Sequence, residues 1–290
     1  MRSLLFYFMV LIGIMTLPMS IVSQTPSYFM HNNVSFLWET DKVLKIPESV
    51  FYNAQDDMLY VSNINGKSNA KDGNGFISKI SLNGKIEELK WAEGMDAPKG
   101  MGKSGDFLYV TDVDRVHKIS FQTGKIVRSF KVDEAKFLND IDVHQSGDIY
   151  VSDMQTSKIY RIKDNNINLW LSDKQLDRTN GLYATDSYLY IGMADQIIRV
   201  NYDDKRITSY FEDTGGIDGL ELFSGKSFLF SDWQGRVYSA SPDKSITKLI
   251  DTRSANKNAA DIEFIKEKNI LLVPTFMANS VSAYKISAVP

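Results

Sequence analysis

The sequence predicts an all-β protein, a six-bladed β-propeller in which six small antiparallel sheets close into a ring. A similar unit occurs six times, and successive units start 38 to 51 residues apart, close to the forty-residue period of a propeller blade. Each unit has a short polar head, an apolar stretch, a turn of Asp, Gly, Ser or Asn, and an aromatic and β-branched run. That order indicates two strands joined by a turn. The long apolar patterns of helical spacing that a helical solenoid would need are absent.

The six heads define the register of the units. Read in order, they are Pro47-Glu48-Ser49-Val50, Pro98-Lys99-Gly100-Met101, Leu138-Asn139-Asp140-Ile141, Thr179-Asn180-Gly181-Leu182, Ile217-Asp218-Gly219-Leu220 and Ala260-Asp261-Ile262-Glu263. The innermost strand of each propeller blade lines the central channel. We therefore expect the six heads to face one another at one rim of that channel.

The remaining strands of each unit follow from its apolar runs. Second strands are expected at residues 58–63, 107–112, 149–153, 188–192, 228–232 and 270–274. They are apolar on both faces, as expected for a sheet sandwiched between two neighbours. Third strands follow at residues 116–119, 158–162, 197–200, 236–239 and 280–286, and Trp91 and Trp170 mark outer fourth strands. The first unit is long because an insertion, residues 67–75, separates its second and third strands.

The two ends of the repeat region complement each other. An apolar segment with Trp38 precedes the first head and resembles an outer strand, while the last unit ends at Pro290 without one. We predict that residues 36–45 supply the missing outer strand of the last blade. This pairing would close the ring and remove two exposed sheet edges.

The first 23 residues are expected to be a secretory signal peptide, followed by a single propeller domain over residues 24–290. A basic start is followed by an almost unbroken apolar run from Leu4 to Met19, which is typical of such signals. Ile21 fits the cleavage pattern poorly, so an uncleaved membrane anchor is the alternative. With no cysteine, the chain can form neither a disulfide nor a lipoprotein attachment. A periplasmic or secreted bacterial protein without a membrane span in its mature form is the expectation.

Charge and composition exclude several functions. The formal net charge is −3, and Lys and Arg form no cluster, so nucleic acid is not expected as a partner. Cysteine nucleophiles are excluded, and the three histidines have no paired metal-ligand spacing. No G-x-S-x-G nucleophile motif occurs. The expected partner is a small molecule.

The heads carry the chemistry that the sequence offers. They present Glu48, Lys99, Asn139, Asn180, Asp218 and Asp261 at equivalent positions. Carboxylate and amide oxygens around one centre suit Ca²⁺, Mg²⁺ or Mn²⁺. The alternative is that pairs such as Asn-Gly and Asp-Gly mark ordinary turns. A lysine beside a divalent ion costs energy, so Lys99 points away, pairs with Asp140 or Asp261, or contacts an anionic substrate.

At these heads the chain resembles the regucalcin and gluconolactonase family, also called the senescence marker protein family. The resemblance covers residues 35–290 and rests on Glu48 after Pro47, Asn139-Asp140, Asn180-Gly181-Leu182 and Asp218-Gly219-Leu220. It implies a six-bladed propeller that hydrolyses sugar lactones or related esters with one divalent cation. Ca²⁺ is the first expectation, with Mg²⁺, Mn²⁺ or Zn²⁺ as alternatives.

The resemblance also implies residue roles. Glu48, Asn180 and Asp218 would bind the metal, and Asp218 would act as a base toward the attacking water. Asn139 would face the substrate, and we add Lys99 and Asp261 as substrate-binding candidates.

Two positions depart from the family pattern: Phe137 stands where the family often has Arg, and Lys99 has no counterpart. The alternative to a hydrolase is a propeller without catalytic activity that binds a ligand or protein.

Overall fold

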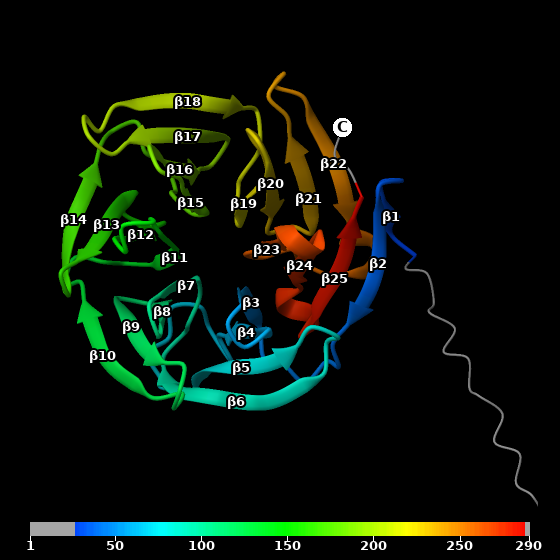
Figure 1. The fold of residues 1–290 in the computed structure, drawn as a ribbon, viewed down its shortest axis with the longest axis horizontal. Helices are drawn as coiled ribbons and strands as arrows, with labels where there is room; N and C mark the ends of the chain where they lie inside the picture. The colour runs from blue at the N-terminus through cyan, green and yellow to red at the C-terminus, as the bar shows by residue number, and fades with distance from the viewer. Residues whose placement is uncertain (1–26, 288–290) are drawn as a thin grey trace, which may run out of the picture.

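The computed structural model describes residues 27–287, and the strands in this range form six sheets arranged around a central axis (Figure 1). The expected signal peptide, residues 1–23, lies outside the described residues. Within residues 27–287, none of the helical segments has the length and apolarity to span a membrane. The predicted six-bladed β-propeller is confirmed.

The strands run outward from the axis in each blade. Blade 1 contains β3 (Pro47–Asn53), β4 (Met58–Asn63), β5 (Gly75–Ser81) and β6 (Ile86–Met95). Blade 2 contains β7 (Met101–Ser104), β8 (Phe107–Asp112), β9 (Arg115–Ser120) and β10 (Ile126–Lys131). Blade 3 contains β11 (Leu138–Val143), β12 (Ile149–Asp153), β13 (Lys158–Lys163) and β14 (Asn166–Ser172).

The second half of the chain repeats the pattern. Blade 4 contains β15 (Leu182–Ala184), β16 (Tyr188–Gly192), β17 (Gln196–Asn201) and β18 (Ile207–Glu212). Blade 5 contains β19 (Leu220–Ser224), β20 (Ser227–Asp232), β21 (Arg236–Ala240) and β22 (Ile246–Asp251). Blade 6 contains β23 (Glu263–Ile265), β24 (Ile270–Pro274), β25 (Val281–Ile286) and β2 (Val34–Glu39). Short 3₁₀ turns lie at η1 (Arg253–Ala255), η2 (Lys266–Lys268) and η3 (Phe276–Ala278).

The ring closes as the sequence predicts, through a strand from the amino-terminal part of the chain. β2 pairs antiparallel with β25 as the outer strand of blade 6. It spans residues 34–39 rather than 36–45, because turns and bends occupy residues 42–46. The sequence analysis missed β1 (Phe29–Met30), a two-residue strand that pairs with β22 as a fifth strand of blade 5.

The hydrophobic core is divided among the blade interfaces. Each of the six interfaces has its own cluster of buried apolar side chains. Between blades 2 and 3, for example, Tyr109 and Phe130 pack against Leu138, Val151 and Tyr160. Each blade therefore depends on both neighbours for burial of its two faces, as in other repeat architectures.

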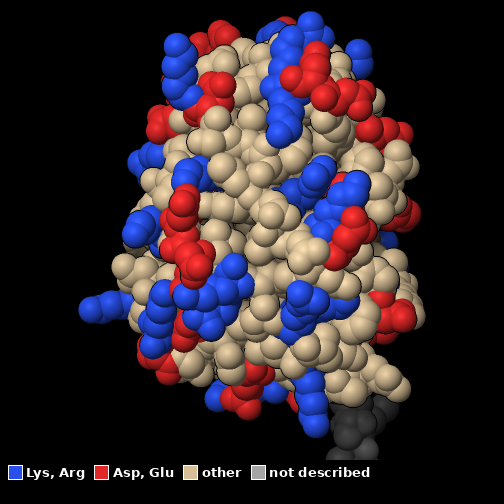
Figure 2. Space-filling model, turned by 90° about the vertical axis from the view of Figure 1, so that its left-hand side faces the viewer, with Lys and Arg blue, Asp and Glu red and all other residues tan. Residues whose placement is uncertain are grey.

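The outer strands form the side wall of the ring. Figure 2 shows acidic and basic side chains interspersed over the face formed by the blades on the left of Figure 1. Among the ion pairs of the outer part of the ring, Lys158 pairs with Glu134 and Arg161 with Asp148. Exposed pairs of this kind contribute little to stability.

Candidate functional site

The head residues of five blades line one cavity at an end of the central channel. Its volume is about 570 Å³. The head residues that line it are Glu48, Lys99, Asn139, Asn180 and Asp218. Each of them is at most 8% exposed. The structure thus brings together the three residues expected to bind a metal and two of the three expected to bind substrate.

Asp261, the head residue of blade 6, lies elsewhere. It lines a second cavity of about 250 Å³, further along the inner strands, together with Asp140, Asp142, Glu221 and Glu263. Its carboxylate accepts a hydrogen bond of 2.6 Å from the Ser49 hydroxyl. The Asp261 N–H also donates to the Glu48 carbonyl oxygen at 2.9 Å, so Asp261 adjoins the head cavity while its side chain lines the second cavity.

A serine near the end of the second strand helps to position the head in blades 1, 3 and 5. Ser62, Ser152 and Ser231 each accept a 2.9 Å hydrogen bond from a backbone N–H of the head in the same blade, those of Ser49, Asp140 and Gly219. These bonds hold each head at a bulge where the inner strand begins, at Pro47 in blade 1 and Leu138 in blade 3.

In blades 1 to 3, an Asp or Asn at the end of the second strand fixes the segment before the head. Asp112 accepts bonds from the N–H groups of Asp96 and Ala97, and Asp153 from those of Lys136 and Phe137. Asn63 accepts one from Lys45 in the same way. The sequence analysis did not use this signal, which is visible as Ser-Asn, Thr-Asp and Ser-Asp at the ends of successive second strands.

The glycine that follows three of the heads allows adjacent blades to approach closely. A Cβ atom at Gly100, Gly181 or Gly219 would lie 2.6, 2.7 or 2.3 Å from an atom of the next blade. None of the three has a positive φ, and the heads lead into inner strands rather than hairpins. The turn interpretation of these Gly pairs therefore does not apply. Gly is required because a side chain would collide with the neighbouring backbone.

Glu48 is the least satisfied polar group in the head cavity. Its side chain is 5% exposed, and its Oε2 atom is buried without a hydrogen-bond partner among the described residues. Burial, and then the charges of Asp218 and Asp261, raise the pKa of Glu48 well above its usual value. A buried carboxylate oxygen without a partner is costly, so this atom is available to a bound cation or proton donor.

Asn180 and Asp218 form a pair opposite Glu48 across blades 4 and 5. Asn180 Nδ2 donates to Asp218 Oδ1 at 2.9 Å, which directs the amide oxygen of Asn180 away from that contact. Burial raises the pKa of Asp218 to about 7, although the Asn180 hydrogen bond opposes the shift. One carboxylate oxygen and one amide oxygen thus remain available on this side of the cavity.

The oxygen groups of this cavity fit a hard divalent cation. Among residues 27–287, no three His, Cys, Asp or Glu side chains lie close enough together to hold a metal. An ion bound by Glu48 and Asp218 would therefore need an amide oxygen, and Asn180 can supply it. Mixed carboxylate and amide oxygens are ligands that Ca²⁺, Mg²⁺ and Mn²⁺ accept.

Lys99 is buried in the wall of the same cavity. It is 1% exposed, and its ammonium donates to the Ala97 carbonyl oxygen at 2.8 Å. The Nζ atom also lies 4.5 Å from the centre of the Phe137 ring, a cation–π contact. Burial lowers the pKa of Lys99, and the negative charge of Glu48 opposes that effect. Phe137 and Lys99 are the two residues that depart from the family pattern, and they contact each other.

Comparisons with known proteins give the fold alone. No protein-family model matches the sequence, and no curated protein does. Among solved structures, a gluconolactonase from Xanthomonas campestris superimposes with a TM-score of 0.65 at 12% identity, covering 87% of this chain and 89% of its own. A streptogramin B lyase gives 0.64 at 12% identity, covering 87% and 97%. A virginiamycin B lyase from Staphylococcus aureus gives 0.61 at 15% identity, covering 87% and 98%.

These neighbours have the propeller architecture that the resemblance to the regucalcin and gluconolactonase family implies. Gluconolactonases are among the proteins that share this fold, but lyases share it as well. Because the same ring supports different activities, function has to be argued from the head cavity. The chain has the six-bladed β-propeller architecture found in gluconolactonases.

Proposed function

We propose that this protein is a divalent-metal-dependent hydrolase of sugar lactones or related esters. The observation that carries the proposal is the buried, unpartnered Glu48 Oε2 atom in the same cavity as the Asn180–Asp218 pair. Glu48, Asn180 and Asp218 would hold the cation. When bound, it would polarise the substrate carbonyl and make a water molecule a stronger nucleophile.

The side chains around these three residues have separate roles in the proposal. Asp218 accepts the proton of the attacking water as a general base. Asn139, on the inner strand of blade 3, donates a hydrogen bond to the substrate. Lys99 presents its ammonium to the oxygen that becomes negative as the ester bond breaks.

The signal-like residues 1–23 support action outside the cytoplasm, in the periplasm or after secretion. The small-molecule substrate of the proposal fits a cavity of this size.

The direct test compares lactone hydrolysis by the wild type with that by Asp218→Asn and Glu48→Gln, with Ca²⁺ or Mn²⁺ present and after chelation. Each substitution, and chelation, should lower the rate by about 100-fold or more. Glu221→Gln is the matched control, because it neutralises a carboxylate that lines the second cavity, and it should retain full activity.

Metal-dependent thermal stabilisation gives a second readout. Millimolar Ca²⁺ should raise the unfolding temperature of the wild type and not that of Glu48→Gln. Equal hydrolysis rates in the wild type and both site variants would refute the catalytic assignment, leaving a propeller that binds ligands without catalysis.

A further inference from the structure

The head cavity has an apolar wall in addition to its polar head residues. The apolar side chains that line it include Phe137, Met154, Met193, Ile217, Trp233 and Phe276. A volume of about 570 Å³ falls in the range, roughly 300–1,000 Å³, of sites that enclose a drug-sized ligand. The space is therefore suited to a molecule with both a polar and an apolar part.

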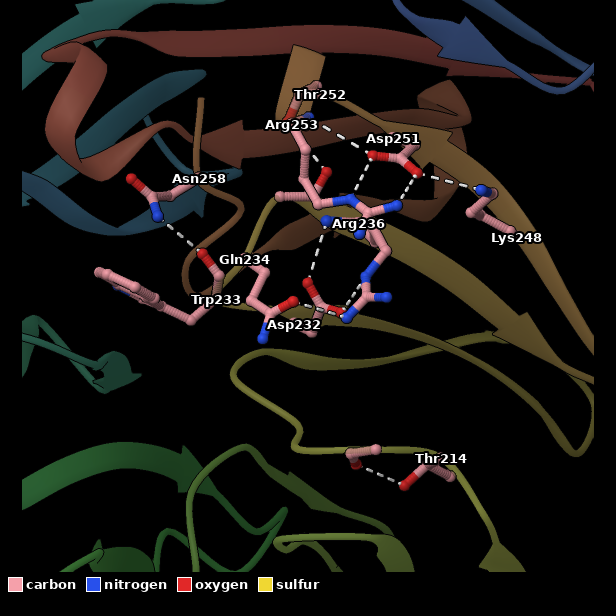
Figure 3. Close-up of polar contacts among 12 residues, drawn as sticks. Thr214, Asp232, Trp233, Gln234, Arg236, Lys248, Asp251, Thr252, Arg253 and Asn258 are labelled. Atoms are coloured by element: carbon pink, nitrogen blue, oxygen red, sulfur yellow. Dashed lines mark hydrogen bonds and ion pairs between the residues drawn. The ribbon is translucent and has the colours of Figure 1, made fainter. Parts of the chain in front are cut away.

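Trp233 is the most conspicuous residue of this wall. Its side chain is 49% exposed, although an indole of this size is usually well buried. It lies on the loop between β20 and β21, where its carbonyl oxygen accepts a 2.8 Å hydrogen bond from Asn258 Nδ2. Figure 3 shows the Trp233 ring extending away from the polar groups of that loop.

The loop that carries Trp233 is held at both ends. Asp232 accepts hydrogen bonds from the backbone N–H and the Nε atom of Arg236, and Arg236 also donates to Gln234. Thr252 donates from its hydroxyl to the carbonyl oxygen of Gly235. These contacts, most of which Figure 3 shows, hold the backbone that carries the indole in place before any ligand binds, which reduces the entropy cost of binding.

Phe276 supports the indole from blade 6. The two rings meet edge to face with centroids 5.6 Å apart, and Phe276 also packs against the buried cluster of Ile64, Ala97 and Val113. Its φ of +47° is a left-handed conformation that is rare for a bulky side chain. Strain of this kind persists where surrounding contacts enforce it, and it is concentrated at ligand sites.

We propose, resting on the hydrolase function above, that the substrate carries an apolar substituent that packs against Trp233 and Phe276 while its carbonyl lies at Glu48, Asn180 and Asp218. The substrate class is then an alkyl- or aryl-substituted lactone or ester rather than an unsubstituted sugar lactone. Trp233 determines specificity and takes no part in bond breaking. It should affect KM for the substituted substrate and leave kcat unchanged.

The test compares δ-valerolactone with δ-decalactone, which adds a pentyl arm to the same ring. Wild type should hydrolyse δ-decalactone with a kcat/KM at least tenfold higher than that for δ-valerolactone. Trp233→Ala should lose most of this preference because its KM for δ-decalactone rises, while its kcat and KM for δ-valerolactone stay unchanged. Trp233→Phe, which keeps an aromatic ring, should retain part of the preference. Leu169→Ala is the control, because Leu169 is equally exposed at 51% but lies on the outer strand β14.

A binding measurement separates this inference from the hydrolase proposal. 2-Pentyltetrahydropyran has the ring and the arm but no carbonyl, so it cannot be hydrolysed. It should change the tryptophan fluorescence of wild type and Leu169→Ala but not of Trp233→Phe, and bind at least tenfold more tightly than tetrahydropyran. This result without any lactone hydrolysis would support the apolar site and refute the hydrolase.

Two results would overturn the inference. One is hydrolysis of both lactones by the wild type with equal kcat/KM. The other is an equal loss for both lactones in Trp233→Ala, because a general defect would show that the indole does not recognise the arm.

Discussion

The glycine after a head residue illustrates how a single position constrains the whole site. Gly219 follows Asp218, and a Cβ atom there would lie 2.3 Å from the backbone nitrogen of Ile262 in the next blade. The two inner segments can therefore approach only if residue 219 lacks a side chain. That approach places Asp218 and the blade 6 head side by side at the axis.

We expect Gly219→Ala to lower the free energy of unfolding by about 2 kcal/mol, because the new methyl group would force two backbones apart. Gly216→Ala is the matched control, since its Cβ would meet only the Ala194 carbonyl oxygen at an ordinary 3.6 Å, and it should change stability by less than about 0.5 kcal/mol. Chemical denaturation measures both values. Similar effects of the two substitutions would contradict the steric explanation.

At the scale of elements, acidic side chains link neighbouring inner strands along the channel. Asp140 accepts from the N–H of Leu182 at 2.5 Å, and Asp142 from that of Ala184 at 2.6 Å. Both bonds join β11 to β15 in the next blade. Glu263 likewise accepts from the N–H of Tyr52 in blade 1. These carboxylates satisfy backbone donors that the separate sheets leave unpaired.

The closing strand β2 is the other link between distant parts of the chain. Besides its backbone pairing with β25, Glu39 accepts hydrogen bonds of 2.6 Å from both Lys257 and Ser280. Trp38 contributes to the core between blades 6 and 1. A single six-residue strand thus completes one sheet and one interface.

A chain that begins at residue 41 should unfold at least about 10 °C below the full-length protein, because it loses this sheet edge and part of a core cluster. A chain that begins at residue 32 keeps β2 and loses β1 and the Tyr28–Tyr284 hydrogen bond; it is the control, with a smaller expected decrease. Calorimetry compares the three chains. A similar decrease for both truncations would show that β2 is not the element that closes the ring.

At the scale of the whole molecule, the second cavity makes stability depend on pH. The pKa of Asp142 is raised to about 6 and the pKa of Glu263 to about 7, mainly because both carboxyl groups are buried. Because a raised carboxyl pKa means that the folded protein holds the proton more tightly than the unfolded chain, the associated stability is present at low pH. It is lost as pH rises from about 4 through these two values.

We expect the unfolding temperature to fall between pH 5 and pH 8 and Glu263→Gln to reduce that fall. The variant should be more stable than wild type by roughly 1 kcal/mol at pH 8 and nearly equal to it at pH 5. Thermal unfolding at both values is the measurement, with Glu212→Gln on the exposed end of β18 as the control. A gain of the same size at both pH values would indicate a cause other than ionisation of Glu263.

The sequence predicted some parts of this protein well because they depend on local patterns. Strands alternate or run apolar over a few residues, and their turns have characteristic residues. The position of β4 could therefore be read from residues 58–63 alone. β1 could not, because a two-residue strand has no pattern and forms only where β22 offers an edge.

The sequence by itself determined the number of blades, the strand that closes the ring and the set of head residues, since each is repeated or is adjacent to a repeat. Only the tertiary structure decided that Asp261 lies in the second cavity, that Glu48 Oε2 has no partner, and that Trp233 and Phe276 share a wall with the heads. The physical reason is that these properties depend on distances across the axis between residues far apart in the chain, which no local pattern encodes.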